Sequence, residues 1–202
     1  MPLVRKPSTP VRPAAAALLG EGTSDERWMA ARSAAERPDG AALLAAALAH
    51  ESDPRVREAI FTGLARIATA ESAAAVVPYL RSDDANLRSG AIDALRAMPE
   101  ASRPHLPGLL ADPDPDVRLL SCELVRGLPD SEANHLLCEL LEVETEKNVC
   151  AAAVEVLAEI GRPEALPSLS RCATRFDGDP FIAFSIKIAI DRIVAPPSPQ
   201  RG

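Results

Sequence analysis

A pattern that recurs every 30 to 33 residues constrains the fold of this chain more than any other feature. In each copy an acidic residue is followed, three positions later, by an apolar residue. The five copies begin at Asp53, Asp84, Asp114, Glu146 and Asp179. A sixth, degenerate copy begins at Asp25. Self-similarity at a fixed period of this length predicts a repeat architecture, in which neighbouring units cover one another's apolar faces.

Each copy has the signals of a helical hairpin. The acidic residue is a candidate N-cap, and in three copies a proline follows it, where the missing N–H costs nothing. Apolar residues then recur at helical spacing, as at Leu64 and Ile67. A turn and a shorter apolar stretch follow, as in residues 73–80, 133–141 and 165–173. The sequence therefore predicts an all-α fold, a right-handed α-α superhelix of about five to six short hairpins without strands.

The repeats divide the chain into three predicted parts. Residues 1–21 form an N-terminal arm, with a terminal helical turn at residues 14–19 that caps the array. Residues 22–195 form the repeat domain, and the proline-rich tail 196–202 is expected to be disordered.

Composition narrows the function classes. The net charge of −7 argues against nucleic acid as a partner, because phosphate neutralisation needs a basic surface. No apolar run is long enough to span a membrane, and the N-terminus lacks the apolar core of a signal peptide. The 4 cysteines lie in helical patterns and form no C-x-x-C pair, which predicts reduced thiols and a cytoplasmic protein. The excess of Arg over Lys and the many Ala residues are typical of a GC-rich bacterial genome.

Two segments carry a resemblance to a known family. Asp-Pro-Asp-Val-Arg at residues 114–118 and Gly-Arg-Pro-Glu-Ala-Leu-Pro-Ser-Leu at residues 161–169 resemble the short HEAT-like repeats of the phycobilisome-lyase type. The resemblance extends over residues 22–195. It implies the solenoid fold but no single function, since such repeats serve lyases, adaptors, chaperones and scaffolds. It also implies an Asp–Arg ladder between neighbouring repeats, expected here only in the middle of the array, at Asp53/Arg57, Asp84/Arg88 and Asp114/Arg118.

The residues of several chemistries are missing, so we predict no enzyme activity, cofactor or metal. The three histidines lie on different repeats, and His50-Glu51 is a single pair where deoxyhypusine hydroxylases repeat it. The basic aromatic groove of HEAT-like DNA glycosylases is missing as well, and we expect Trp28 to pack in the core. Cys122 and Cys150 are predicted core residues, whereas Cys172, beside an arginine, is a candidate for partial exposure.

The favoured function is a non-catalytic protein–protein interaction module, an adaptor, scaffold or regulatory protein. Its partner-binding candidates are polar or aromatic residues that break the apolar pattern of the second helices, namely Tyr79, His105, His135, Glu139 and Arg171. The alternative is a bilin lyase-type subunit or tetrapyrrole chaperone, which the resemblance suggests but the scarcity of aromatic residues disfavours.

The last helix supplies a second candidate surface. On a helical wheel Phe181, Phe184 and Ile188 form an apolar ridge, apart from a broad face that includes Ile182 and Ile186 and is expected to pack on the preceding repeat. The linker around Phe176, or the tail, would cover this ridge, or it forms a docking or dimerisation patch. The predicted partner is another protein or a second copy of this chain.

Overall fold

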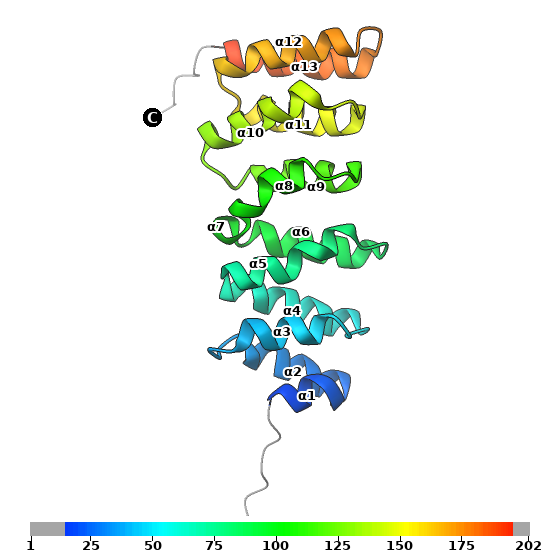
Figure 1. Ribbon diagram of the computed structural model, residues 1–202, viewed down its shortest axis with the longest axis vertical. Coiled ribbons are helices and arrows are strands. Elements are labelled where there is room, and N and C mark those ends of the chain that lie inside the picture. The colour runs from blue at the N-terminus through cyan, green and yellow to red at the C-terminus, as the bar shows by residue number, and fades with distance from the viewer. Residues whose placement is uncertain (1–14, 196–202) are drawn as a thin grey trace, which may run out of the picture.

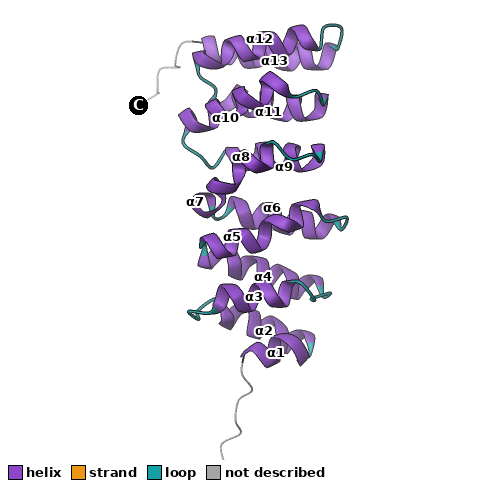
Figure 2. Ribbon diagram, viewed as in Figure 1, coloured by secondary structure: helices purple, strands orange, loops and turns teal. Residues whose placement is uncertain are grey.

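The computed structural model describes residues 15–195, and over these residues it consists of helices joined by short turns, without strands (Figures 1 and 2). The longer helices are α1 (Ala15–Glu21), α2 (Ser24–Ala34), α3 (Gly40–Leu48), α4 (Pro54–Ile67), α5 (Ala70–Val76), α6 (Ala85–Arg96), α9 (Pro115–Val125), α10 (Asp130–Val143), α11 (Lys147–Ile160), α12 (Leu166–Arg175) and α13 (Pro180–Val194). Shorter turns of helix are η1 (Val77–Arg81), α7 (Pro99–Ser102), η2 (Arg103–His105), α8 (Leu106–Leu110) and η3 (Pro163–Ala165). The prediction of an all-α solenoid is confirmed. The predictions for the first part of the arm and for the tail concern residues 1–14 and 196–202, which lie outside the described residues.

The helices form a stack of hairpins in two layers (Figure 1). The first helices of the hairpins are α2, α4, α6, α9, α11 and α13, and each packs against the next one along the chain. The second helices form the other layer. Helix α1 packs on α2 and α3 and so covers the N-terminal end of the stack, where the sequence predicted a terminal turn.

The acidic residues of the repeat begin the first helices, as predicted. The carboxylates of Asp53, Asp84, Asp114 and Asp179 accept hydrogen bonds from backbone N–H groups of the first turn. Glu146 occupies the same position, but its side chain makes no such bond. The local sequence therefore fixes where these helices start.

The start of the first repeat differs from the prediction. Asp25 does not cap a helix, because α2 begins at Ser24 after the N-cap Thr23. Thr23 and Glu26 form a capping box, in which the threonine hydroxyl accepts from the Glu26 N–H and the Glu26 carboxylate accepts from the Thr23 N–H at 2.8 Å. This start places the cap of the first repeat in register with the caps of the later repeats.

Buried carboxylates connect neighbouring repeats. The arginine four residues after a cap donates two hydrogen bonds to a glutamate that lies two residues before the next cap. Arg27 binds Glu51 at 2.8 and 3.0 Å, and Arg118 binds Glu144 at 2.6 and 2.9 Å. The side chains of Glu51 and Glu144 are only 4% and 2% exposed. Each carboxylate also accepts from the two backbone N–H groups that follow it, so it holds the turn and the adjacent repeat together.

The expected Asp–Arg ladder forms at one step only, between Arg57 and Asp84 at 2.9 Å. Arg118 binds Glu144 instead. Arg88 donates to the backbone carbonyl of Ser82 at 2.6 Å and makes no ion pair within the described chain. At the Arg118 step the ladder prediction was wrong because the acidic partner lies two residues before the cap rather than at the cap. At the Arg88 step the equivalent acid, Asp112, is paired with Arg81 instead.

The core between the layers is built mainly from Leu, Ile, Val and Ala, as the composition required. Predicted core residues such as Leu64, Leu95 and Leu157 are fully buried or nearly so, whereas Ile67 is half-buried. The second helix of the third hairpin is divided into α7, η2 and α8. Prolines at 104 and 107 explain this division, since each lacks the N–H that a continuous helix would use.

We expect Asp114→Ala to lower the free energy of unfolding by about 1 kcal/mol, the usual cost of losing an N-cap. The Asp114 carboxylate accepts from the Asp116 N–H at 2.9 Å. Denaturant unfolding measures the difference, and Asp116→Ala is the matched control. Equal stability of Asp114→Ala and the parent would contradict this helix start.

Glu144→Gln should both destabilise the protein and flatten its response to acid. Burial raises the pKa of the Glu144 carboxyl, but hydrogen bonds from Arg118 and from the Glu146 and Thr145 N–H groups outweigh burial, so the net pKa lies below the ordinary 4.5. A lowered folded-state pKa means that the stabilisation is present above the unfolded-state value and is lost as the pH falls through the folded-state value. The free energy of unfolding should therefore fall on acidification below about pH 4.5, and fall less steeply in Glu144→Gln.

The loss of unfolding free energy at neutral pH is the second quantity to measure for Glu144→Gln. Removing one partner of a buried ion pair costs about 3 kcal/mol or more. The control is Asp39→Asn, whose pair with Arg37 is exposed and is worth at most about 1 kcal/mol. If the two variants are equally stable at pH 7, the buried carboxylate does not hold the repeats together.

Candidate functional site

The candidate site is the outer face of the first helices, where equivalent residues of successive repeats form rows. One row lies five residues after each cap and contains Trp28, Glu58, Ser89, Leu119, Ala151 and Phe184. The next row, one turn later, contains Arg32, Thr62, Asp93, Glu123, Glu155 and Ile188. Because the first helices run parallel to one another, these rows cross the face from one end of the stack to the other. Side chains of both rows line hollows between neighbouring first helices.

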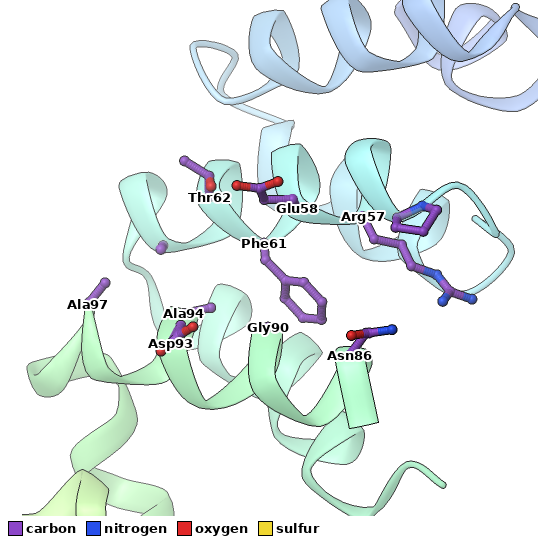
Figure 3. A pocket seen from close by; sticks show the side chains of 11 residues that line it. Arg57, Glu58, Phe61, Thr62, Asn86, Gly90, Asp93, Ala94 and Ala97 are labelled. Atoms are coloured by element: carbon purple, nitrogen blue, oxygen red, sulfur yellow. The ribbon is translucent and has the colours of Figure 1, made fainter. Parts of the chain in front are cut away.

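The central hollow lies between α4 and α6 and has a volume of about 530 Å³ (Figure 3). The Phe61 side chain points from α4 toward Gly90 on α6, which has no side chain to oppose the ring. Arg57 and Asn86 lie at one end of the hollow, and Asp93 lies toward the other. The hollow thus combines an aromatic floor with polar ends, the composition of a small binding site for a side chain or peptide.

The floor of this hollow is supported from behind by Tyr79. Its ring meets the Phe61 ring edge to face, with centroids 5.9 Å apart. Burial raises the pKa of the Tyr79 phenol, and the nearby Arg57 charge opposes this effect. Arg57 is held by Asp84 and by the Glu51 carbonyl, so the polar end of the hollow is fixed in place.

The N-terminal hollow, between α2 and α4, is built around Trp28. The prediction that Trp28 packs in the core was wrong in part: the side chain is half-buried and lies on the outer row, because the cap is Thr23 rather than Asp25. The guanidinium carbons of Arg32 and Arg55 each lie 4.8 Å from the centre of the indole ring, within the range of cation–π attraction. This hollow therefore exposes one aromatic ring between two cations.

The C-terminal hollow, between α11 and α13, contains the predicted ridge. Phe181, Phe184 and Ile188 all line it, and its volume is about 580 Å³. Phe181 and Phe184 are 63% and 65% exposed, whereas Ile188 is half-buried. Phe176 is half-buried and packs against the core, yet it leaves both of these phenylalanines exposed, so the expected covering by this linker is not observed.

The opposite face of α13 packs on the array, as expected, but over a narrower arc than predicted. Ile182, Ile186 and Ala189 are buried. Ala183 and Val194, which the helical wheel also placed on the packed face, are exposed. α13 packs against α11 and α12, and no further helix of the described chain follows it.

The candidate residues on the second helices are not brought together. Tyr79 and His105 are half-buried, in different hairpins. His135 and Glu139 are exposed on α10 and lie 3.4 Å apart. Arg171 is exposed and binds Glu142, whose pKa its hydrogen bonds lower to about 2. Whether these residues bind a partner stays a prediction.

The cysteines have the environment of core residues. Cys122, Cys150 and Cys172 are fully buried, so Cys172, a candidate for partial exposure, is a core residue as well. Burial raises the pKa of the Cys122 thiol to about 12, and a hydrogen bond with Cys172, together with burial, raises that of Cys150. Within residues 15–195 no group of three or more His, Cys, Asp or Glu side chains could hold a metal ion. No described helix has the length and apolar character that crossing a bilayer requires.

The hollows on the outer face were not predicted from the sequence. Phe61 and Gly90 were not among the candidate residues. The signal that could have identified them is their position, since both are on the first helices close to the two outer rows. Alignment on the correct cap, Thr23, would have placed Trp28 in those rows as well.

The described fold, parallel first helices stacked over a second layer, defines the chain as a helical repeat solenoid. A family model for HEAT repeats matches residues 2–96, 41–115 and 102–181, and the chain belongs to this family. No curated protein sequence matches it. The more specific phycobilisome-lyase type remains a resemblance.

Two solved structures illustrate the similarity of fold. An archaeal HEAT-like repeats protein from Thermococcus onnurineus NA1 is 18% identical, with a TM-score of 0.54, and the match covers 89% of this chain and 85% of that chain. A chain from a study of microtubule plus end tracking by XMAP215, CLIP-170 and EB1 is 14% identical, with a TM-score of 0.58, and the match covers 90% of this chain and 91% of that chain. At these identities the likeness concerns the fold alone.

Gly90→Ala and Gly108→Ala should change stability in opposite directions. A Cβ at Gly90 would lie 2.6 Å from the Phe61 ring, which is buried and cannot move freely, whereas one at Gly108 would meet nothing within 4 Å. We expect Gly90→Ala to lower the free energy of unfolding by about 1 kcal/mol or more. Gly108→Ala, in the exposed part of α8, should raise it by about 0.5 kcal/mol. Denaturant unfolding of both variants checks this, and a stabilised Gly90→Ala would show that the Phe61 ring does not depend on the glycine.

Proposed function

We propose that this chain is a non-catalytic protein-interaction module that binds its partner on the outer face of the first helices. The proposal rests on the location of the exposed apolar side chains. In residues 15–195 the large apolar side chains that are more than half exposed are Met29, Val143, Phe181, Phe184 and Val194. Met29, Phe181 and Phe184 line hollows on this one face. Exposed apolar residues gathered beside hollows mark interaction sites.

The character of the rest of the chain supports binding rather than catalysis. The repeat solenoid is a fold typical of binding modules, because it presents an extended surface built from equivalent positions. Burial raises the pKa of the Cys122 thiol, and a hydrogen bond with Cys150 lowers the pKa of the Cys172 thiol. Cys122, Cys150 and Cys172 are all fully buried, which does not favour a nucleophile that reaches a substrate. The alternative, a bilin lyase-type subunit or tetrapyrrole chaperone, predicts a shift of the visible spectrum when a bilin is added, and we expect none.

The second helices remain a competing surface. His135 and Glu139 form an exposed pair there, on α10. Arg171 is exposed on α12, the second helix of the next hairpin. Their charged side chains are already engaged in ion pairs. Among the described residues, the large apolar side chains that are more than half exposed are Val143 on a second helix and Met29, Phe181, Phe184 and Val194 on first helices. The two faces are on different layers of helices, so substitutions on one leave the other intact.

The test is a selection of binding peptides from a displayed random library, followed by mapping of the selected peptides on variants. We expect Thr62→Trp together with Asp93→Arg, on the first helices, to weaken binding at least tenfold. His135→Ala with Glu139→Ala, on a second helix, should leave binding within about twofold. The opposite outcome would assign binding to the second helices, and a library that yields no ligand would refute the proposed function.

A further inference from the structure

We propose that the C-terminal hollow binds a cationic amphipathic helix of a partner protein. This inference rests on the proposed function and names the partner chemistry for one part of its surface. The hollow is formed by two parallel helices, and residues at equal distances from their caps face each other across it. Asn148 lies opposite Phe181, Ala152 opposite Ser185, Glu155 opposite Ile188, and Glu159 opposite Arg192.

The shape of the hollow fits a helix. Its length from Phe181 to Arg192 corresponds to about 16 Å, or three turns of helix. Small residues line it along α11, at Ala151, Ala152 and Ala158. Small side chains between two parallel helices let a third helix lie close in the groove that they form.

The two ends of the hollow differ in chemistry. Phe181 and Phe184 make the end nearest the caps apolar. At the other end Glu155 and Glu159 have side chains that are 70% and 49% exposed. A ligand that satisfies both ends has apolar side chains on one face and positive charges toward one end.

The charge balance favours a cation. Glu123, Glu155 and Glu159 all lie close to a single arginine, Arg126, which bridges α9 and α11. Among the described residues that line the hollow, the charged ones are Glu155, Glu159 and Arg192. Arg192 pairs with none of the three glutamates. The three carboxylates therefore exceed the cations around them, in a chain whose net charge is already −7.

The same features disfavour a second copy of this chain as the occupant. A twofold axis that runs along the hollow would bring the glutamates of the two copies together. The two exposed phenylalanines present about 250 Å² of apolar surface, taking about 200 Å² for each side chain. A stable protein interface buries about 800 Å² on each partner. A short helix needs less surface for a weak, specific contact.

The probe is a fluorescein-labelled model helix of leucine and lysine, with the lysines on one face and toward one end. Its affinity is measured by fluorescence anisotropy, against a matched peptide in which glutamate replaces each lysine. We expect the lysine peptide to bind at least tenfold more tightly than the glutamate peptide. Phe184→Ser, at an exposed position, should weaken binding of the lysine peptide at least tenfold and leave the circular dichroism spectrum of the protein unchanged.

The charge control separates the hollow from the general acidity of the chain. Glu155→Lys together with Glu159→Lys should weaken binding of the lysine peptide at least tenfold. Glu71→Lys with Asp83→Lys makes the same change of net charge at exposed positions on other elements, and should leave binding within about twofold. Equal loss in both double variants, or unchanged binding in Phe184→Ser, would overturn the proposal.

Self-association is measured on the same proteins by sedimentation. We expect a monomer for both the parent and Phe184→Ser. A dimer that Phe184→Ser dissociates would show that the hollow is an interface between copies and would overturn the proposal. If the lysine peptide fails to bind while library-selected peptides still depend on Thr62 and Asp93, this inference fails and the proposed function stands.

Discussion

The buried carboxylate at the turns before α4 and α11 is the interaction that fixes the register of the neighbouring repeats there. Glu51 and Glu144 each accept hydrogen bonds from an arginine of the preceding repeat and from the backbone of their own turn. A buried carboxylate is costly unless its oxygens are fully bonded. Here the bonds come from two repeats at once, so the charge is satisfied only when both repeats are in register. The interaction therefore contributes more to the register of the stack than to its net stability.

This register creates the outer face. With the first helices held parallel and aligned at their caps, residues at equal distances from the caps come to face each other across each groove. A small residue in one helix then leaves a hollow beside a large residue in the next. Ala151 and Phe184, at equal distances from their caps, contribute to the C-terminal hollow in this way. In the central hollow Gly90 lies beside Phe61 with an offset of two residues relative to the caps. The hollows are thus a consequence of the repeat, and their chemistry is set by the few positions where the repeats differ.

The parts of the fold that depend on local signals could be predicted from the sequence, and the parts that depend on tertiary contacts could not. The caps at Asp53 and Asp114 follow from an acid before a proline, a signal contained within a few residues. Asp25 was misassigned because its repeat has a stronger signal two residues earlier, the capping box of Thr23 and Glu26.

The candidate site was predicted less completely, for a similar reason. Glu144 looks like a surface glutamate in the sequence, and only the fold buries it and brings the half-buried Arg118 to it. The separation of Phe181 and Phe184 from the packed face followed from a helical wheel, because it concerns the residues of one helix. The hollow around Phe61 and Gly90 needs two helices in the correct register, which the sequence pattern alone does not supply.

The C-terminal repeats show what happens where the carboxylate link is lost. The position of the linking arginine is occupied by Cys150 in α11 and by Ala183 in α13. The Cys150 thiol still contacts the Glu144 carbonyl, at 3.8 Å, but it carries no charge to reach the next turn. Arg175 takes over part of the task by donating to the carbonyls of Leu141 and Glu144 at 2.8 Å, which ties α12 to the end of α10.

The link between α11 and α13 is therefore made mainly by apolar packing, through Ile182, Ile186 and Ala189. Apolar packing fixes the distance between two helices but places few demands on the residues outside the contact. The outer positions of α13 therefore need not match those in the middle of the array. Phe184 and Ile188 occupy positions that are polar in α4 and α6. The step between α11 and α13, which has no arginine at the linking position, is also the step whose outer hollow carries the exposed Phe181 and Phe184.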